Sequence, residues 1–148
     1  MGSLILPRSG TVYAGAQIFI YSIEKHPDYA PFLLPLWHAV AGETIEVVSS
    51  ELSLMETLVG PLERSDAQLV ADYEKLFQQD GIRLISISRD MLRDAAKLRA
   101  ANSAIRTPDA LHAATARLIG CSMFLTNDAG FRRVPGLPFF VLSEMISS

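Results

Sequence analysis

The sequence has a single cysteine, Cys121, and therefore cannot form an internal disulfide bond. A reducing, cytoplasmic compartment is the expectation for such a chain. Basic residues are fewer than acidic ones: the sequence has 13 Lys and Arg and 16 Asp and Glu, which gives a formal net charge of −3. Nucleic-acid-binding modules that rely on a basic surface carry the opposite balance, so the composition argues against that class.

No apolar run in the sequence is long enough to cross a bilayer. The longest, residues 31–42, is interrupted by Pro35 and carries His38, whereas a spanning helix needs about 20 apolar residues. No basic segment followed by an apolar run opens the chain, so we expect neither a secretory leader nor membrane association. The three histidines lack the spacing of zinc ligands, which argues against a zinc site.

The chain does have enough apolar material for one core. Its 148 residues are 49% hydrophobic and 20% charged, and this length is typical of one domain. No repeat, low-complexity segment or linker divides the sequence. We therefore expect a single domain over residues 1–148.

Short β-branched segments alternate with helical segments along the chain. Strands are expected at residues 11–14, 45–48, 82–87, 123–125 and 138–142, and helices at residues 18–24, 29–41, 51–59, 65–77, 88–101 and 107–119. The alternation predicts an α/β fold, in three layers (α/β/α), with a central parallel sheet of four to five strands.

Local signals predict where individual helices begin and end. Ser50 and Thr107 are expected as N-caps, because their hydroxyls can accept backbone N–H groups at a helix start. The Gly60-Pro61 pair is expected to end the helix that begins near residue 51. A break is expected near Pro35, since proline removes a hydrogen bond from a helix interior.

Acidic residues fall where a parallel sheet places its ligands, beyond the carboxyl ends of the strands. Glu56 and Asp109 lie early in two helices, and Asp128 follows the fourth strand. Three converging carboxylates suit a hard cation such as Mg²⁺ or Mn²⁺, which would attract phosphate and activate water. Taken singly, each acid also has an ordinary structural role, in a helix start, a turn or a solvated helix face.

Four segments, in order, resemble the motifs of the PIN-domain family, and within it the VapC-like toxins of type II toxin–antitoxin systems. The segments are VYAGAQIFIY at 12–21, SSELSLMETL at 49–58, RTPDALHAA at 106–114 and FLTNDAGF at 124–131. The resemblance implies a PIN-like parallel sheet flanked by helices and a cytoplasmic endoribonuclease that depends on Mg²⁺ or Mn²⁺. It also implies three partners: RNA as substrate, a cognate antitoxin protein and a second copy of the chain in a homodimer.

By position, the resemblance implies catalytic and metal-binding acids at Glu56, Asp109 and Asp128. It also implies a catalytic role for Thr126, which would hold a metal-bound water or orient a carboxylate. Asn127 matches a polar position beside the last acid and is a candidate substrate contact.

Two other residues near the acids are candidate substrate contacts. Arg106, just before a predicted helix, would meet an RNA phosphate or pair with an acid. His112 lies one helical turn after Asp109, so it would touch substrate or pack beside the sheet, and packing is the favoured interpretation.

The first motif departs from the family, which places an aspartate where this chain has Gly15. Glycine supplies no carboxylate, so the resemblance implies a site without its central metal ligand. The glycine marks either a natural degenerate member or an introduced Asp→Gly change that inactivates the site, and three intact motifs favour a recent loss.

Three hypotheses follow from the sequence. The first is a metal-dependent endoribonuclease toxin impaired by Gly15. The second is a catalytically inactive PIN-like module that binds RNA or protein. The third is an unrelated doubly wound domain with incidental acids, which ranks last because the sequence has no glycine-rich phosphate loop.

Overall fold

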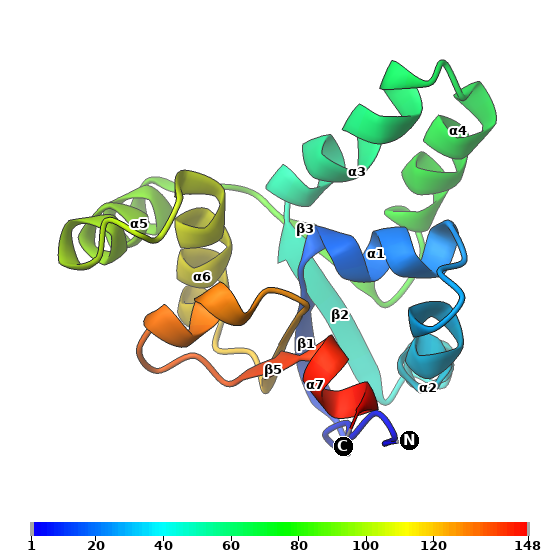
Figure 1. The fold of residues 1–148 in the computed structure, drawn as a ribbon, viewed down its shortest axis with the longest axis horizontal. Helices are drawn as coiled ribbons and strands as arrows, with labels where there is room; N and C mark the ends of the chain where they lie inside the picture. The colour runs from blue at the N-terminus through cyan, green and yellow to red at the C-terminus, as the bar shows by residue number, and fades with distance from the viewer. Residues whose placement is uncertain (1, 148) are drawn as a thin grey trace.

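The structure, a computed structural model, describes residues 2–147, in which five strands form one parallel sheet (Figure 1). The strand order is β3-β2-β1-β4-β5, and every neighbouring pair is parallel. The strands are β1 (Gly10–Ala14), β2 (Ile45–Ser50), β3 (Ile82–Ile85), β4 (Met123–Thr126) and β5 (Phe139–Val141). The predicted α/β class and parallel sheet are confirmed.

Helices cover both faces of the sheet, and the α3–α4 hairpin projects at the top of Figure 1. The helices are α1 (Ala16–Ile23), α2 (Tyr29–Ala41), α3 (Leu52–Glu63), α4 (Ala67–Leu76), α5 (Arg89–Ala101), α6 (Thr107–Ile119) and α7 (Leu142–Ile146), with a short 3-10 helix η1 (Ala129–Arg133). Within the described part of the chain, no helix combines the length and apolar character that a bilayer crossing requires.

The central strand β1 shows why the sheet is buried on both faces. Val12 and Ala14 belong to the core under α1, α2, α4 and α7, whereas Tyr13 belongs to the core under α5 and α6. All three side chains are fully buried. Successive strand residues point to opposite faces, so this short apolar run supplies both cores.

Helix α6 lies close to the sheet because its inner face is built from alanine. Ala110, Ala113 and Ala114 are fully buried against the sheet. The helix ends at Gly120, whose φ of 70° is the left-handed conformation that glycine adopts without strain. This packing holds the start of α6 at the carboxyl edge of the sheet.

Two predicted N-caps are displaced by one residue. Ser50 is the last residue of β2 and Glu51 takes the N-cap position, although the Ser50 hydroxyl still accepts the Leu52 N–H at 3.1 Å. Thr107 is the first residue of α6, and Arg106 is its N-cap without a side-chain hydrogen bond.

Both prolines expected to interrupt a helix lie inside one. Helix α2 runs through Pro35, and α3 continues past Pro61 to Glu63. Each proline removes only one backbone hydrogen bond, and tertiary packing compensates, since Leu36 belongs to the core and Pro61 is buried. The predictions of a break near Pro35 and a helix end at Gly60 were wrong for this reason.

Candidate functional site

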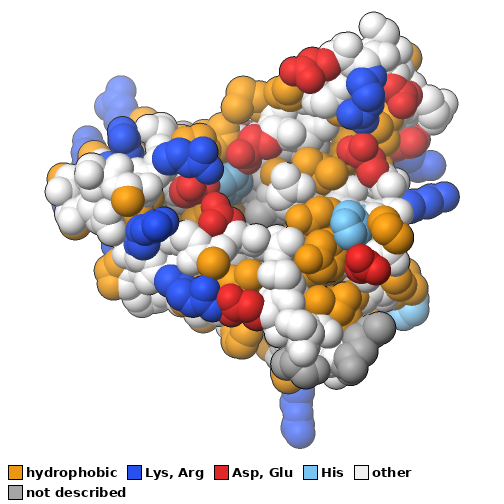
Figure 2. Space-filling model, viewed as in Figure 1, with side chains coloured by type: hydrophobic (Ala, Val, Ile, Leu, Met, Phe, Trp, Pro, Cys, Tyr) orange, Lys and Arg blue, Asp and Glu red, His pale blue; other side chains and the backbone are white. Residues whose placement is uncertain are grey.

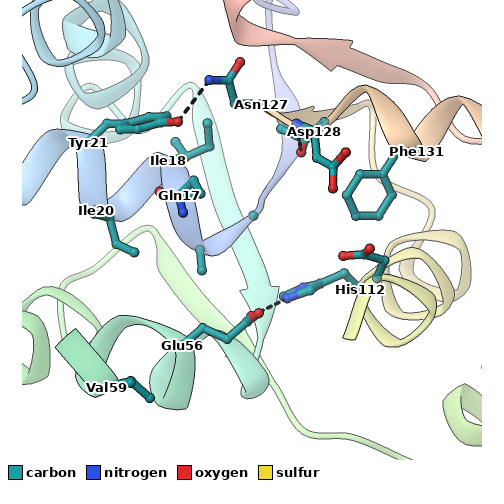
Figure 3. Close-up of a pocket in the computed structure, with 14 residues that line it drawn as sticks. Gln17, Ile18, Ile20, Tyr21, Glu56, Val59, His112, Asn127, Asp128 and Phe131 are labelled. Carbon is teal, nitrogen blue, oxygen red and sulfur yellow. Dashed lines mark hydrogen bonds and ion pairs between the residues drawn. The ribbon is translucent and has the colours of Figure 1, made fainter. Parts of the chain in front are cut away.

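A pocket opens at the carboxyl edge of the sheet, where β1 and β4 lie side by side. The chain order reverses between these two strands, and such a switch point is where open α/β sheets bind ligands. The Gly15 N–H donates to the Leu125 carbonyl at 3.1 Å, which fixes the two strand ends together. The pocket (Figure 3) is lined by Gly15, Ala16, Gln17, Ile18, Ile20, Tyr21, Glu56, Val59, Asp109, His112, Thr126, Asn127, Asp128 and Phe131.

The pocket brings together residues from all four predicted motifs. Glu56 comes from α3, Asp109 from the first turn of α6, and Asp128 from the N-cap of η1. Burial raises the pKa of the Asp109 carboxyl, and the negative charges of Asp128 and Glu56 raise it further. Arg106 acts in the opposite direction on that pKa, from a distance of 3.7 Å to the Asp109 carboxylate. The three acids therefore share one electrostatic environment.

Asp128 is held by the backbone around it. The Thr126 hydroxyl accepts the Asp128 N–H at 3.0 Å, and Asp128 Oδ1 accepts the Gly130 N–H at 2.8 Å. Thr126 is buried, with 6% of its surface exposed. In the structure it fixes the turn that carries Asp128, and its predicted catalytic role stays a prediction.

Glu56 is held by a buried histidine. His112 Nε2 lies 2.6 Å from Glu56 Oε1, and Nδ1 lies 2.6 Å from the hydroxyl of Tyr13 (Figure 3 shows the Glu56 contact). His112 is only 4% exposed, so the predicted packing beside the sheet is confirmed. Its contact with substrate stays a prediction.

The network behind His112 assigns its tautomer. The Tyr13 hydroxyl accepts the Ser50 N–H at 3.0 Å, and burial raises the pKa of this hydroxyl far above its ordinary value, so it keeps its proton. That proton is donated to His112 Nδ1, which leaves Nε2–H to donate to Glu56. The chain Tyr13–His112–Glu56 thus directs one carboxylate oxygen.

Asn127 links three elements at the other side of the pocket. Its Nδ2 donates to the Tyr21 hydroxyl of α1 at 3.0 Å, and its Oδ1 accepts the Ser143 N–H of α7 at 2.9 Å. Both ends of the amide therefore serve the fold, and its predicted contact with substrate stays a prediction.

Gly15 lines the pocket and has ordinary backbone angles. Its φ of −69° and ψ of 164° are extended values that any residue adopts. A Cβ added there would meet the Leu125 carbonyl oxygen at 3.9 Å, an ordinary van der Waals contact. The fold therefore accepts a side chain at this position and does not require glycine.

The donor set is incomplete for a hard cation. Within residues 2–147, no three Asp, Glu, His or Cys side chains lie close enough to hold a metal ion. Glu56 is directed to His112, and Gly15 offers no donor in the space between the strand ends. Mg²⁺ and Mn²⁺ need several oxygen ligands in close array, so the residues present do not make such a site.

The roles of two tyrosines in the site were not predicted from the sequence. Tyr13 has the pattern of a core residue in a strand, and nothing in its spacing signals that its hydroxyl meets His112. Tyr21 was detectable in principle, because it lies four residues after Gln17 and thus shares a helix face with it. Only the fold shows that this face lines the pocket.

Comparison with known families shows which family has this fold and these motifs. The family model of the PIN domain matches residues 15–137. The chain belongs to the PIN-domain family. The match spans the segments that carry Gly15, Glu56, Asp109 and Asp128, all of which line the pocket. None of the curated proteins compared with the chain matches it.

Solved structures of toxin–antitoxin complexes share this PIN fold. VapBC2 from Rickettsia felis, bound to a promoter DNA fragment, has a TM-score of 0.72 and 21% identity, and the match covers 88% of this chain and 98% of that chain. A toxin–antitoxin complex from Klebsiella pneumoniae has a TM-score of 0.66 and 20% identity over 88% and 97%. DNA-bound VapBC from Salmonella typhimurium has a TM-score of 0.62 and 16% identity over 89% and 98%. At these identities the likeness concerns the fold.

Proposed function

We propose that the chain is a VapC-like endoribonuclease toxin of a type II toxin–antitoxin system, impaired in RNA cleavage by Gly15. The observation that carries the proposal is the position of Gly15. It lies in the pocket of a PIN fold beside three carboxylates, and its backbone accepts a side chain that it lacks. The protein acts in the cytoplasm, where RNA is its substrate.

The missing carboxylate explains why the acids do not close into a cation site. A bound Mg²⁺ or Mn²⁺ would neutralise phosphate charge and activate a water for hydrolysis. In this chain, Asp109 and Asp128 face the pocket without the carboxylate that would join them to Glu56 across the strand ends. An aspartate at position 15 adds both an oxygen ligand and a negative charge at that point.

An antitoxin protein is the proposed partner. The structures similar to this chain include toxin–antitoxin complexes. Helix α3 also exposes an apolar stripe of Met55, Val59 and Leu62, with exposed fractions of 57%, 46% and 62%. The spacing places these residues on one helix face, and Val59 also lines the pocket. A protein that covers the stripe therefore reaches the mouth of the pocket.

Cleavage of RNA in the presence of Mn²⁺ tests the proposal. This chain and the variants Gly15→Asp and Gly15→Ala are compared on the same RNA, with Gly15→Asp/Asp109→Asn as a further control. Only Gly15→Asp is expected to cleave, at least about 100-fold faster than this chain, because one transition-state contact is commonly worth that factor. The cleavage should stop with EDTA.

Two results would contradict this proposal. Full activity of the chain as it stands would show that Gly15 does not impair the site. Absence of cleavage by a folded Gly15→Asp variant would favour the alternative, a catalytically inactive PIN-like module that binds RNA or protein. The incomplete donor set of the described residues is the observation that keeps this alternative open.

A further inference from the structure

A second hollow adjoins the pocket across two of its carboxylates. Asp109, Asp128 and Phe131 line both, and Arg106 and Arg133 line only the second. We call this second space the arginine hollow; it is lined by Ala104, Ile105, Arg106, Asp109, Asp128, Gly130, Phe131, Arg133 and Val134. Figure 2 shows basic side chains beside acidic ones on this side of the molecule.

Most arginines of the chain already have a protein oxygen as partner. Those that donate a hydrogen bond to a carboxylate or a carbonyl are Arg64, Arg83, Arg93, Arg99, Arg117 and Arg132. Among the described residues, the arginines of the hollow lack such a bond, as do Arg8 and Arg89 outside it; Arg106 only approaches Asp109, at 3.7 Å, with 79% of its side chain exposed. Arg133 is exposed, and its side chain has no hydrogen bond or ion pair with any residue of 2–147.

Gly130 allows the Arg133 side chain to lie beside the acids. A Cβ on Gly130 would come within 3.0 Å of an Arg133 guanidinium nitrogen and 2.9 Å of Asp128 Oδ1. The side chains of Arg133 and Asp128 thus share the space over this glycine. The guanidinium stands next to the carboxylate pocket while its donors remain available.

We propose that Arg106 and Arg133 form a phosphate subsite that binds a backbone phosphate of single-stranded RNA next to the carboxylate pocket. This inference rests on the proposed function for its choice of RNA. Guanidinium groups bind phosphate through paired hydrogen bonds, and the acids of the pocket repel phosphate. Because the chain carries a net charge of −3, its attraction for RNA in the absence of cations comes from such local groups.

The position of the subsite sets the path of the RNA strand. Asp109 and Asp128 form the border between the two hollows. A strand bound in the arginine hollow therefore crosses these carboxylates to enter the pocket. The phosphate held by the arginines is a neighbour of the phosphate that faces the acids.

Salt-dependent binding of RNA tests this subsite in the protein as it exists. A fluorescein-labelled oligouridylate is titrated with the chain in EDTA, and anisotropy gives the binding constant at several salt concentrations. The variant Arg106→Gln/Arg133→Gln is expected to bind more weakly. The slope of log K against log salt should fall by about 0.7, since one phosphate contact to a single strand contributes about that amount.

Two matched variants separate local from general charge effects. Arg93→Gln/Arg132→Gln removes the same charge from arginines that pair with Asp90 and Glu144, and the slope should remain that of the parent. Arg106→Lys/Arg133→Lys keeps the charge and should retain most of the slope. Thermal unfolding of each variant should match the parent, because the altered side chains in the hollow are exposed.

Three outcomes would overturn the subsite: no binding of oligouridylate by the parent at low salt, an unchanged slope in Arg106→Gln/Arg133→Gln, or an equal loss in the charge-matched control. The outcomes for nuclease activity are separate. Arginine-dependent binding together with an inactive Gly15→Asp variant would keep the subsite and reject the nuclease. Cleavage by Gly15→Asp, with a KM that does not change when both arginines are also replaced, would keep the nuclease and reject the subsite.

Discussion

The pocket has an acidic wall, which carries Glu56, Asp109 and Asp128, and an uncharged wall, which is formed by the end of β1 and by α1. In the acidic wall, Glu56 is held by hydrogen bonds that run from the buried Tyr13 through His112. The uncharged wall begins at Gly15, where the backbone has ordinary angles and room for a Cβ.

The two walls differ in what their residues do for the fold. A buried polar network is stable only when its members are hydrogen-bonded, so the position of Glu56 in the acidic wall depends on Tyr13 and His112. Nothing comparable depends on the residue at position 15. A substitution at position 15 adds or removes a metal ligand while the fold stays the same. We therefore expect substitutions at Tyr13 and His112 to lower stability much more than substitutions at Gly15.

The largest effect on stability is expected at His112. His112→Ala leaves a cavity and removes the partners of Tyr13 and Glu56, so the free energy of unfolding should fall by about 2–4 kcal/mol. Urea denaturation measures this change. His38→Ala is the control, because His38 is exposed. A loss of less than about 0.5 kcal/mol in His112→Ala would show that the fold does not depend on the network that holds Glu56.

Tyr13→Phe tests the base of the same network. The ring is retained, but the Ser50 N–H and His112 Nδ1 lose their partner. The free energy of unfolding should fall by about 1–3 kcal/mol, the usual effect of unpaired buried polar groups. Tyr29→Phe is the matched control, since the Tyr29 hydroxyl has no hydrogen bond to another residue of 2–147. Equal losses in the two variants would contradict the assigned role of Tyr13.

Asp109→Asn tests repulsion within the acidic wall. The folded pKa of Asp109 is raised, so its charge destabilises the fold at pH 7, and the variant should unfold at a higher temperature. The gain should shrink as pH falls towards about 3.9, where an unfolded aspartate is also protonated. Partial exposure screens this charge, so the effect should be smaller than that of Tyr13→Phe. Asp72→Asn on an exposed helix face is the control, and a pH-independent gain in Asp109→Asn would show that charge repulsion is not its cause.

Gly15→Ala should have the smallest effect. The added Cβ reduces the entropy of the unfolded chain, while alanine is a poorer N-cap than glycine for α1, and these contributions oppose each other. The free energy of unfolding should change by less than about 0.5 kcal/mol in thermal or urea denaturation. A loss beyond about 1.5 kcal/mol would show that the uncharged wall requires glycine.

Periodicity and composition were sufficient to predict the parallel sheet and most helices. The runs at β1, β2 and β4 are apolar on both faces, which is typical of buried parallel strands. Helix α3 was predicted too short, because packing of Pro61 outweighs its local effect on the backbone. Such long-range packing leaves no local signal in the sequence.

The acids of the site were predictable because parallel strands end at one edge of the sheet. The residues that hold Glu56 could not be predicted, since the contact between Tyr13 and His112 joins residues 99 positions apart. The accessible backbone of Gly15 also required the structure, because a glycine in the sequence does not reveal its φ and ψ. The arginine hollow depends in the same way on how η1 folds over the start of α6.

Binding of Mn²⁺ to Gly15→Asp is the most direct test of the central claim, that this position lacks a ligand which the fold can accept. Calorimetric titration should show Mn²⁺ binding at least about tenfold tighter in Gly15→Asp than in this chain, as expected for loss or gain of a ligand contact. Gly15→Asn, which has the same shape without the charge, should fall short of that gain. Equal Mn²⁺ affinity in Gly15→Asp and this chain, with both folded, would contradict the account.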